Sequence, residues 1–163
     1  MLDSPVWDQG NCLKDLARVG DIYSVVQLAG ENIAVGRWSK TKKNRILKSR
    51  VKGTKLLAEY FANYNQKPRV IISASAVGFY GDRGAEIVDE DSKAGNGFLA
   101  NVCVQWEDAL KVAAKAGIRV IKVRFGTVLS KKGRDLKDTT ADQIGARRSF
   151  RQRGAIYELG QYL

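Results

Sequence analysis

The chain has 163 residues, of which 44% are hydrophobic, and a formal net charge of +11 at pH 7. This length suits one domain, and the apolar fraction is enough to form a buried core. The sequence contains no run of 18 apolar residues, no basic stretch followed by an apolar one at its start, and no histidine. It therefore predicts no transmembrane helix, no signal peptide, and no histidine-based triad or metal site. Cys12 and Cys103 lack metal-like spacing and fit packing residues in a reduced, cytoplasmic setting.

The first clear pattern in the chain is Ile22–Leu28, a short run of β-forming residues that predicts a strand. Before it, Pro5–Trp7 and Leu13–Val19 suggest a short strand and a short helix. The strand runs into Leu28-Ala29-Gly30, and a glycine there allows a sharp turn and the close approach of a ligand.

A long helix is predicted next, beginning after Ser39 as N-cap and ending near Asn63. Its apolar stripe is predicted from residues spaced by three and four: Leu47, Val51, Thr54, Ala58 and Phe61. Nine basic residues occur between Arg37 and Lys55 with no acidic residue among them. We expect them mostly on a solvated face, with Arg50 beside the stripe and directed toward the sheet. The alternative is a surface that binds polyanions.

The central segment is Arg69–Asp82, with the sequence RVIISASAVGFYGD. The apolar run Val70–Ile72 predicts a parallel strand covered on both faces. Ser73 and Ser75 follow at its carboxyl end, which is where open α/β sheets bind ligands. Beyond it, a loop predicted over Gly81–Gly97 holds three adjacent acidic residues at 89–91, which we interpret as loop capping because neighbouring positions seldom converge on one metal ion.

The last predicted elements are a helix over about Phe98–Ala116 and a strand over Ile118–Arg124. Gly117 suits the position just after the helix, and Thr127 follows the strand at its carboxyl end. The alternating order of strands and helices predicts parallel strands joined by right-handed crossovers. The expected fold is therefore α/β, a partial Rossmann-like, doubly wound parallel sheet that lacks the first strand–helix unit.

Six segments also carry a resemblance, in the order VVQLAGENIAVGRW, SRVKGTKLL, ISASAVGFYGDRG, DEDS, FLANVCVQWE and RFGTVLSKKG. Together they resemble the extended short-chain dehydrogenase/reductase superfamily, and within it the atypical epimerase family proteins of the NAD-dependent epimerase/dehydratase type. The resemblance covers the chain up to Gly133. It implies a dinucleotide cofactor, NAD or NADP with NADP favoured, and a small-molecule substrate related to nucleotide sugars.

The resemblance also implies which residues form the site. The cofactor-binding residues would be Leu28, Ala29, Gly30, Arg50, Ser73 and Thr127. Ser75 and Tyr80 are the candidate catalytic residues. The usual Tyr-x-x-x-Lys pair, in which the lysine lowers the pKa of the tyrosine, is absent from the helix that begins at Phe98, as it is in the atypical branch. Tyr80 is the nearby phenol in sequence that would replace it.

The resemblance further suggests what this chain leaves out. The glycine fingerprint that holds a pyrophosphate is expected on a strand–helix unit before residue 1, and a substrate-binding region is expected beyond Gly133. The predicted domains are residues 1–133, a partial NAD(P)-binding domain, and residues 134–163, a tail that looks out of frame. Two alternatives stay open: an inactive remnant of the family, and a basic polyanion-binding module, although no recognised nucleic-acid motif supports the latter.

Overall fold

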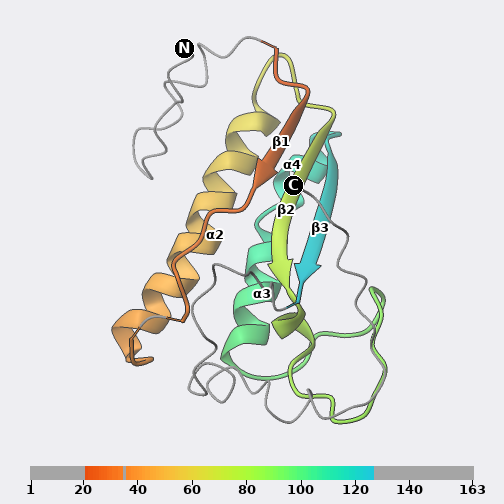
Figure 1. Ribbon diagram of the computed structural model, residues 1–163. Coiled ribbons are helices and arrows are strands. Elements are labelled where there is room, and N and C mark those ends of the chain that lie inside the picture. The colour runs from red at the N-terminus through yellow and green to blue at the C-terminus, as the bar shows by residue number, and fades with distance from the viewer. Residues whose placement is uncertain (1–20, 35, 127–163) are drawn as a thin grey trace, which may run out of the picture.

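The computed structural model describes residues 21–34 and 36–126, and these form an α/β fold (Figure 1). The elements in chain order are β1 (Ser24–Gln27), α2 (Lys40–Ala62), β2 (Val70–Ala76), the 3-10 helix η1 (Val77–Tyr80), α3 (Phe98–Asp108), α4 (Lys111–Lys115) and β3 (Arg119–Phe125). This order confirms the predicted one. The predictions for Pro5–Trp7, Leu13–Val19, Thr127 and residues 134–163 lie outside the described residues.

The three strands form one parallel sheet in the order β1-β2-β3, as predicted. Their register places Gln27 beside Ser73, and Ser75 beside Arg124. Polar residues near the carboxyl ends of all three strands therefore lie at one edge of the sheet. This arrangement is the partial Rossmann-like fold expected from the sequence.

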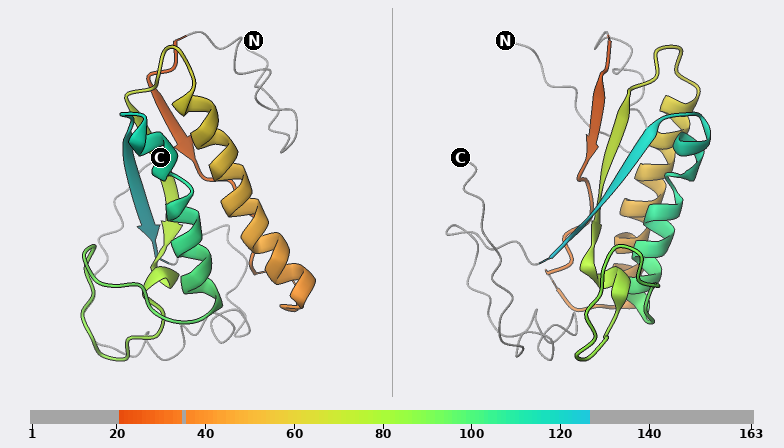
Figure 2. Two further views of the ribbon diagram at one scale, coloured as in Figure 1. Left: turned by 180° about the vertical axis from the view of Figure 1, so that it is seen from behind. Right: turned by 90° about the vertical axis from the view of Figure 1, so that its right-hand side faces the viewer.

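The described helices all lie on one face of the sheet, as the edge-on view in Figure 2 shows. Two crossovers of the same hand that advance in one direction across a sheet place both helices on the same side. In β2, Ile71, Ser73 and Ser75 are buried against the helices, while the residues between them are only partly buried. The prediction of a strand covered on both faces thus holds for one face among the described residues.

Helix α2 begins where predicted, because the Ser39 hydroxyl accepts a hydrogen bond from the Lys42 backbone N–H at 3.2 Å. Its buried stripe is rotated from the predicted one. Thr54, Ala58 and Phe61 are buried as expected, but Ile46 and Leu57 take the places predicted for Leu47 and Val51. The prediction chose the less buried of two adjacent apolar rows, since both rows have helical spacing.

The helix predicted over residues 98–116 is interrupted after Asp108, and α4 resumes at Lys111. At the break, the Leu110 backbone N–H bonds to the carbonyl of Glu107, three residues back, which tightens the turn. Leu110 remains buried in the core. Gly117 follows α4 with a φ of 87°, the conformation predicted for a residue that ends a helix. No helix within residues 21–34 and 36–126 is long and apolar enough to cross a membrane.

Candidate functional site

The interface between helices and sheet changes from apolar to polar along the strands. The apolar cluster lies toward the amino ends of the strands and consists of Leu57, Ala58, Phe61, Ile71, Leu110, Ala113 and Ile118. The buried polar residues gather farther along, toward the carboxyl ends: Gln27, Lys42, Thr54, Ser73, Ser75 and Glu107. Buried polar groups cost free energy unless they are paired, so their concentration at one edge marks this edge as the candidate site.

The turn after β1 lies directly against Arg50 of α2. A Cβ atom built on Gly30 would come within 3.0 Å of the Arg50 Cζ atom, so any larger residue would push the guanidinium away. The hydrogen bonds that this guanidinium makes within the described residues all come from Nη1, to the carbonyl oxygens of Glu31 at 3.1 Å and Ile46 at 3.4 Å. The Arg50 Cζ atom also lies 5.3 Å from the centre of the Trp106 ring. Gly30 and Arg50, two of the predicted cofactor-binding residues, are therefore brought together.

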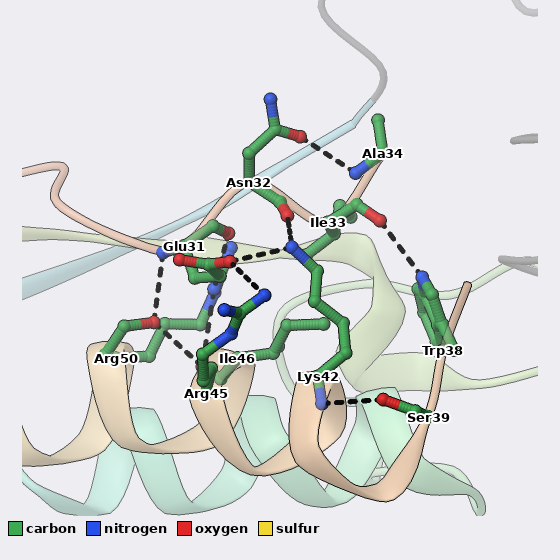
Figure 3. Close-up of polar contacts among 11 residues, drawn as sticks. Glu31, Asn32, Ile33, Ala34, Trp38, Ser39, Lys42, Arg45, Ile46 and Arg50 are labelled. Carbon is green, nitrogen blue, oxygen red and sulfur yellow. Dashed lines mark hydrogen bonds and ion pairs between the residues drawn. The ribbon is translucent and has the colours of Figure 1, made fainter. Parts of the chain in front are cut away.

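A set of contacts from α2 fixes the loop that follows Gly30 (Figure 3). The Lys42 Nζ atom donates to the Glu31 carboxylate at 2.7 Å and to the Asn32 carbonyl at 2.6 Å. The Glu31 backbone N–H donates to the Ser49 hydroxyl at 3.0 Å, and the Trp38 indole donates to the Ile33 carbonyl at 3.0 Å. We call Lys42, Glu31 and the Asn32 carbonyl the Lys42 clamp.

The burial of Lys42 corrects one expectation drawn from the sequence. Only 6% of Lys42 is exposed, so it does not belong to the solvated basic face. Its spacing from Ile46 and Arg50, four residues each time, places it on the row of α2 that faces the strand-end loop. Since Lys42 and Arg50 both turn inward, the basic face available to a polyanion is smaller than the nine residues suggested.

The charges around Glu31 leave an excess of positive charge. Its carboxylate lies 2.7 Å from Lys42 Nζ and 3.5 Å from Arg45 Nη2. The hydrogen bond from Lys42 lowers the pKa of Glu31, and the charges of Arg45 and Arg50 act in the same direction. Burial lowers the pKa of Arg50, and the charge of Glu31 acts in the opposite direction. One carboxylate facing three cations makes this turn attractive to an anion.

A second cluster, which contains both candidate catalytic residues, lies at the ends of β2 and β3. The Ser75 hydroxyl donates to Glu107 Oε1 at 2.7 Å. Arg124 binds both Glu107 oxygens, from Nε at 2.9 Å and from Nη2 at 3.0 Å. From Nη1 it also donates to the Tyr80 hydroxyl at 2.9 Å and to the Glu90 carbonyl at 3.1 Å. Ser75 and Tyr80 are therefore linked through one buried ion pair.

Glu107 is held in its charged form by these contacts. Burial by itself would raise its pKa, but hydrogen bonds from Arg124 and Ser75 and the charges of Arg124 and Lys122 outweigh that effect, so the net pKa is lowered. The Arg124 pKa is raised, chiefly by its hydrogen bonds to Glu107. Cys103, beside Ser75, is a buried free thiol whose pKa is raised by burial, so it behaves as a packing residue, as the sequence suggested.

The other predicted cofactor residues differ in exposure. Leu28 is 63% exposed after the end of β1, and Ala29 is partly buried. Ser73 is buried, and its hydroxyl donates to the Ala74 carbonyl at 3.2 Å. Thr127 lies outside the described residues. In the acidic loop, the Asp89 carboxylate accepts a hydrogen bond from the Ser92 hydroxyl at 2.7 Å, which is a capping role.

Four residues at this edge were not singled out from the sequence: Glu31, Lys42, Glu107 and Arg124. Glu107 had a signal, because it lies four residues after Cys103 and one after Trp106, beside apolar residues that are buried in α3. An acidic residue that is buried in this way needs a partner of opposite charge. Arg124 can be that partner, because the alternation of β3 places it beside Ser75, on the face of the sheet that α3 covers. Lys42 had no such signal because lysines surround it in the sequence.

Comparison with known proteins identifies the family. The model of the NAD dependent epimerase/dehydratase family matches residues 5–160. The chain belongs to this family. An epimerase family protein of Mycobacterium bovis is 41% identical over 130 residues, which cover 78% of this chain and 42% of the relative. A chloroplastic epimerase family protein of Arabidopsis thaliana is 41% identical over 113 residues, covering 68% of this chain and 32% of the relative.

Solved structures agree with this assignment. A nucleoside-diphosphate sugar epimerase from Corynebacterium glutamicum has a TM-score of 0.65 and 43% identity, covering 78% of this chain and 26% of that one. The human epimerase family protein SDR39U1, solved with NADPH, has a TM-score of 0.66 and 32% identity, covering 74% of this chain and 42% of that one. The chain thus spans about two fifths of the length of the mycobacterial relative and of the human protein.

Proposed function

We propose that the chain is part of an NAD(P)-dependent epimerase/dehydratase-like oxidoreductase, and that its strand-end edge contacts the dinucleotide. The observation that carries this proposal is Arg50. Its partly buried guanidinium lies against Gly30 and bonds only through Nη1 within the described residues, so Nε and Nη2 are left to bind a phosphate. The residues therefore fit an anionic cofactor, whose chemistry when bound is hydride transfer.

NADP is the favoured cofactor and a nucleotide-sugar-like molecule the favoured substrate class. Support for NADP comes from the human family member, which was solved with NADPH. Support for the substrate class comes from the Corynebacterium glutamicum protein, described as a nucleoside-diphosphate sugar epimerase. Leu28, Ala29, Ser73 and Thr127 complete the proposed cofactor contacts.

The second cluster gives Ser75 and Tyr80 different hydrogen-bonding roles. The Ser75 hydroxyl hydrogen is already donated to Glu107, so Ser75 can only accept from a substrate hydroxyl. The Tyr80 oxygen accepts from Arg124, which leaves the phenolic hydrogen to be donated. We therefore propose Tyr80 as the group that transfers a proton and Ser75 as an orienting acceptor.

The test is a titration with NADPH. The chain spans two fifths of its relatives, and Arg50 is a single phosphate contact. We therefore expect the isolated chain to bind NADPH with a Kd above about 1 μM, the value at which the binding free energy is about −8 kcal/mol. Arg50→Ala should abolish the binding seen by chemical-shift changes in NMR spectra. Lys48→Ala removes the same charge from an exposed position of α2 and should leave binding intact.

This assignment would be contradicted if the isolated chain bound NADPH with micromolar affinity. It would also be contradicted if Arg50→Ala and Lys48→Ala lost NADPH binding equally. Equal loss would instead indicate a diffuse attraction to the basic face, which is the polyanion-binding alternative. Wild-type protein that shows no response at millimolar NADPH would favour the inactive remnant.

A further inference from the structure

The Lys42 clamp has features that a simple surface ion pair lacks. Ion pairs on the surface contribute little to the stability of a fold, since both side chains stay hydrated and mobile. Here the Lys42 side chain is only 7% exposed, and its ammonium group contacts two acceptors on consecutive residues, the Glu31 carboxylate and the Asn32 carbonyl. Burying a lysine costs desolvation free energy, and here the two contacts of its ammonium group offset part of that cost only while the loop keeps this conformation.

The clamp acts on the same short loop that approaches Arg50. Glu31 is bound from two places along α2 at once: Lys42 binds its carboxylate, while the consecutive residues Ser49 and Arg50 bind its backbone N–H and its carbonyl (Figure 3). Because Glu31 follows Gly30 directly, its orientation sets the position of the Gly30 backbone over the Arg50 guanidinium. Movement of Glu31 would therefore displace both groups that we assign to the dinucleotide.

We propose that Lys42 and Glu31 are positioning residues of the dinucleotide site, which hold the Gly30 turn and the Arg50 guanidinium in the geometry that receives a phosphate. This inference rests on the proposed function. We assign Lys42 to the loop and not to the phosphate, because two of its three ammonium donors bind the loop and its side chain is only 7% exposed.

The experiment compares Lys42→Met and Glu31→Gln with Lys48→Met, which is the same kind of substitution at an exposed lysine of α2. Each variant is titrated with NADP⁺ by NMR, at a temperature where thermal unfolding curves show it fully folded. We expect Lys42→Met and Glu31→Gln to weaken binding by about tenfold, as is typical of coupling between neighbouring sites, and Lys48→Met to leave it unchanged. Lys42→Arg, which keeps a cation with several donors, should recover part of the affinity.

A second measurement is independent of the ligand. The Glu31 backbone N–H donates to Ser49, so its hydrogen exchange should accelerate in Lys42→Met and stay slow in Lys48→Met. If Lys42→Met lowers thermal stability while the folded protein keeps its NADP⁺ affinity, the role is merely structural and the positioning proposal fails. If the wild-type chain itself shows no binding, the proposed function fails and the positioning role falls with it.

Discussion

At the scale of single residues, Arg124 connects more of the site than any candidate chosen from the sequence. Its guanidinium joins the end of β3 to α3 through Glu107, to η1 through Tyr80, and to the acidic loop through the Glu90 carbonyl. It also lies 3.6 Å from the centre of the Phe79 ring. A two-pronged arginine–carboxylate pair adds geometric specificity, so the position of Tyr80 depends on Arg124.

Replacing Arg124 by Met should destabilise the fold strongly. Glu107 would keep its buried carboxylate and lose its main partner, and breaking such a pair from one side costs about 3–5 kcal/mol. Urea unfolding measures this loss as a lower transition midpoint. Arg119→Met is the matched control, because Arg119 lies at the exposed start of the same strand. If both variants lose the same stability, the buried pair has no special role.

The pH dependence of stability checks the same pair. Since the pKa of Glu107 is lower in the folded state than in the unfolded chain, its contribution is complete above the unfolded value of about 4.3 and is lost as the pH falls through the folded value. Wild-type stability should therefore decline below about pH 4.3. In Glu107→Gln this part of the decline should be absent, and a decline equal to that of the wild type would exclude Glu107 as its source.

At the scale of elements, the sequence predicted the type and order of the three strands and of the two long helical segments, and the residues at the ends of α2. Ser39 and Asn63 have local signals, an N-cap hydroxyl and a polar turn, that do not depend on the rest of the fold. The break after Asp108 was missed, because the buried stripe continues through it to Leu110 and hides the interruption. Which of two apolar rows on α2 faces the sheet was also beyond the sequence, since it is decided by packing.

The acidic loop supplies a sharp test at this scale. Gly95 donates its backbone N–H to the Phe79 carbonyl at 2.9 Å, which closes the loop over η1. A Cβ atom built on Gly95 would lie 1.9 Å from the Tyr80 carbonyl oxygen, and backbone atoms cannot yield as a flexible side chain can. Gly95→Ala should therefore open the loop and speed hydrogen exchange of its amides. It should also lower the free energy of unfolding by about 1–3 kcal/mol.

The control for this substitution is Gly126→Ala, whose Cβ would meet no atom of residues 21–34 and 36–126 within 4 Å. That change should alter stability by less than about 0.5 kcal/mol, as is usual for surface substitutions. Unchanged exchange in Gly95→Ala would mean that the loop relaxes freely and does not hold Tyr80 in place.

At the scale of the whole molecule, the fold class and the sheet edge at which the candidate residues gather were predictable, but the partners of these residues were not. Alternation and strand ends placed Gly30, Ser73 and Ser75 at one edge, because parallel strands end together. The contacts from Lys42 to Glu31 and from Arg124 to Glu107 join residues 11 and 17 positions apart on different elements. Such pairs depend on the rotation of each helix about its axis, which single-sequence periodicity does not determine.

The last prediction concerns the reading frame beyond Gly133. Permitted codons for residues 133–145, read one base forward, allow GAILKILPPIKLG, and the same shift over residues 147–163 allows GGRFGSGGQYMSWASI. Both strings resemble the family's next segment, a helix with a Pro-Pro break and a glycine-rich loop before a Trp-containing strand. The mycobacterial relative aligns with 78% of the chain, whereas the family model continues to residue 160.

The base sequence of the gene decides between a shifted frame beyond Gly133 and a family match that continues to residue 160. Synonymous codons leave freedom at nearly every position, so one short shifted match would carry little weight. Two matches in order, produced by the same shift, are much harder to obtain by chance. We therefore expect a single-base lesion near the Gly133 codon, with both shifted strings encoded downstream of it. Bases that cannot encode those strings would show that residues 134–163 are read in their proper frame, and that the family match to residue 160 reflects the chain itself.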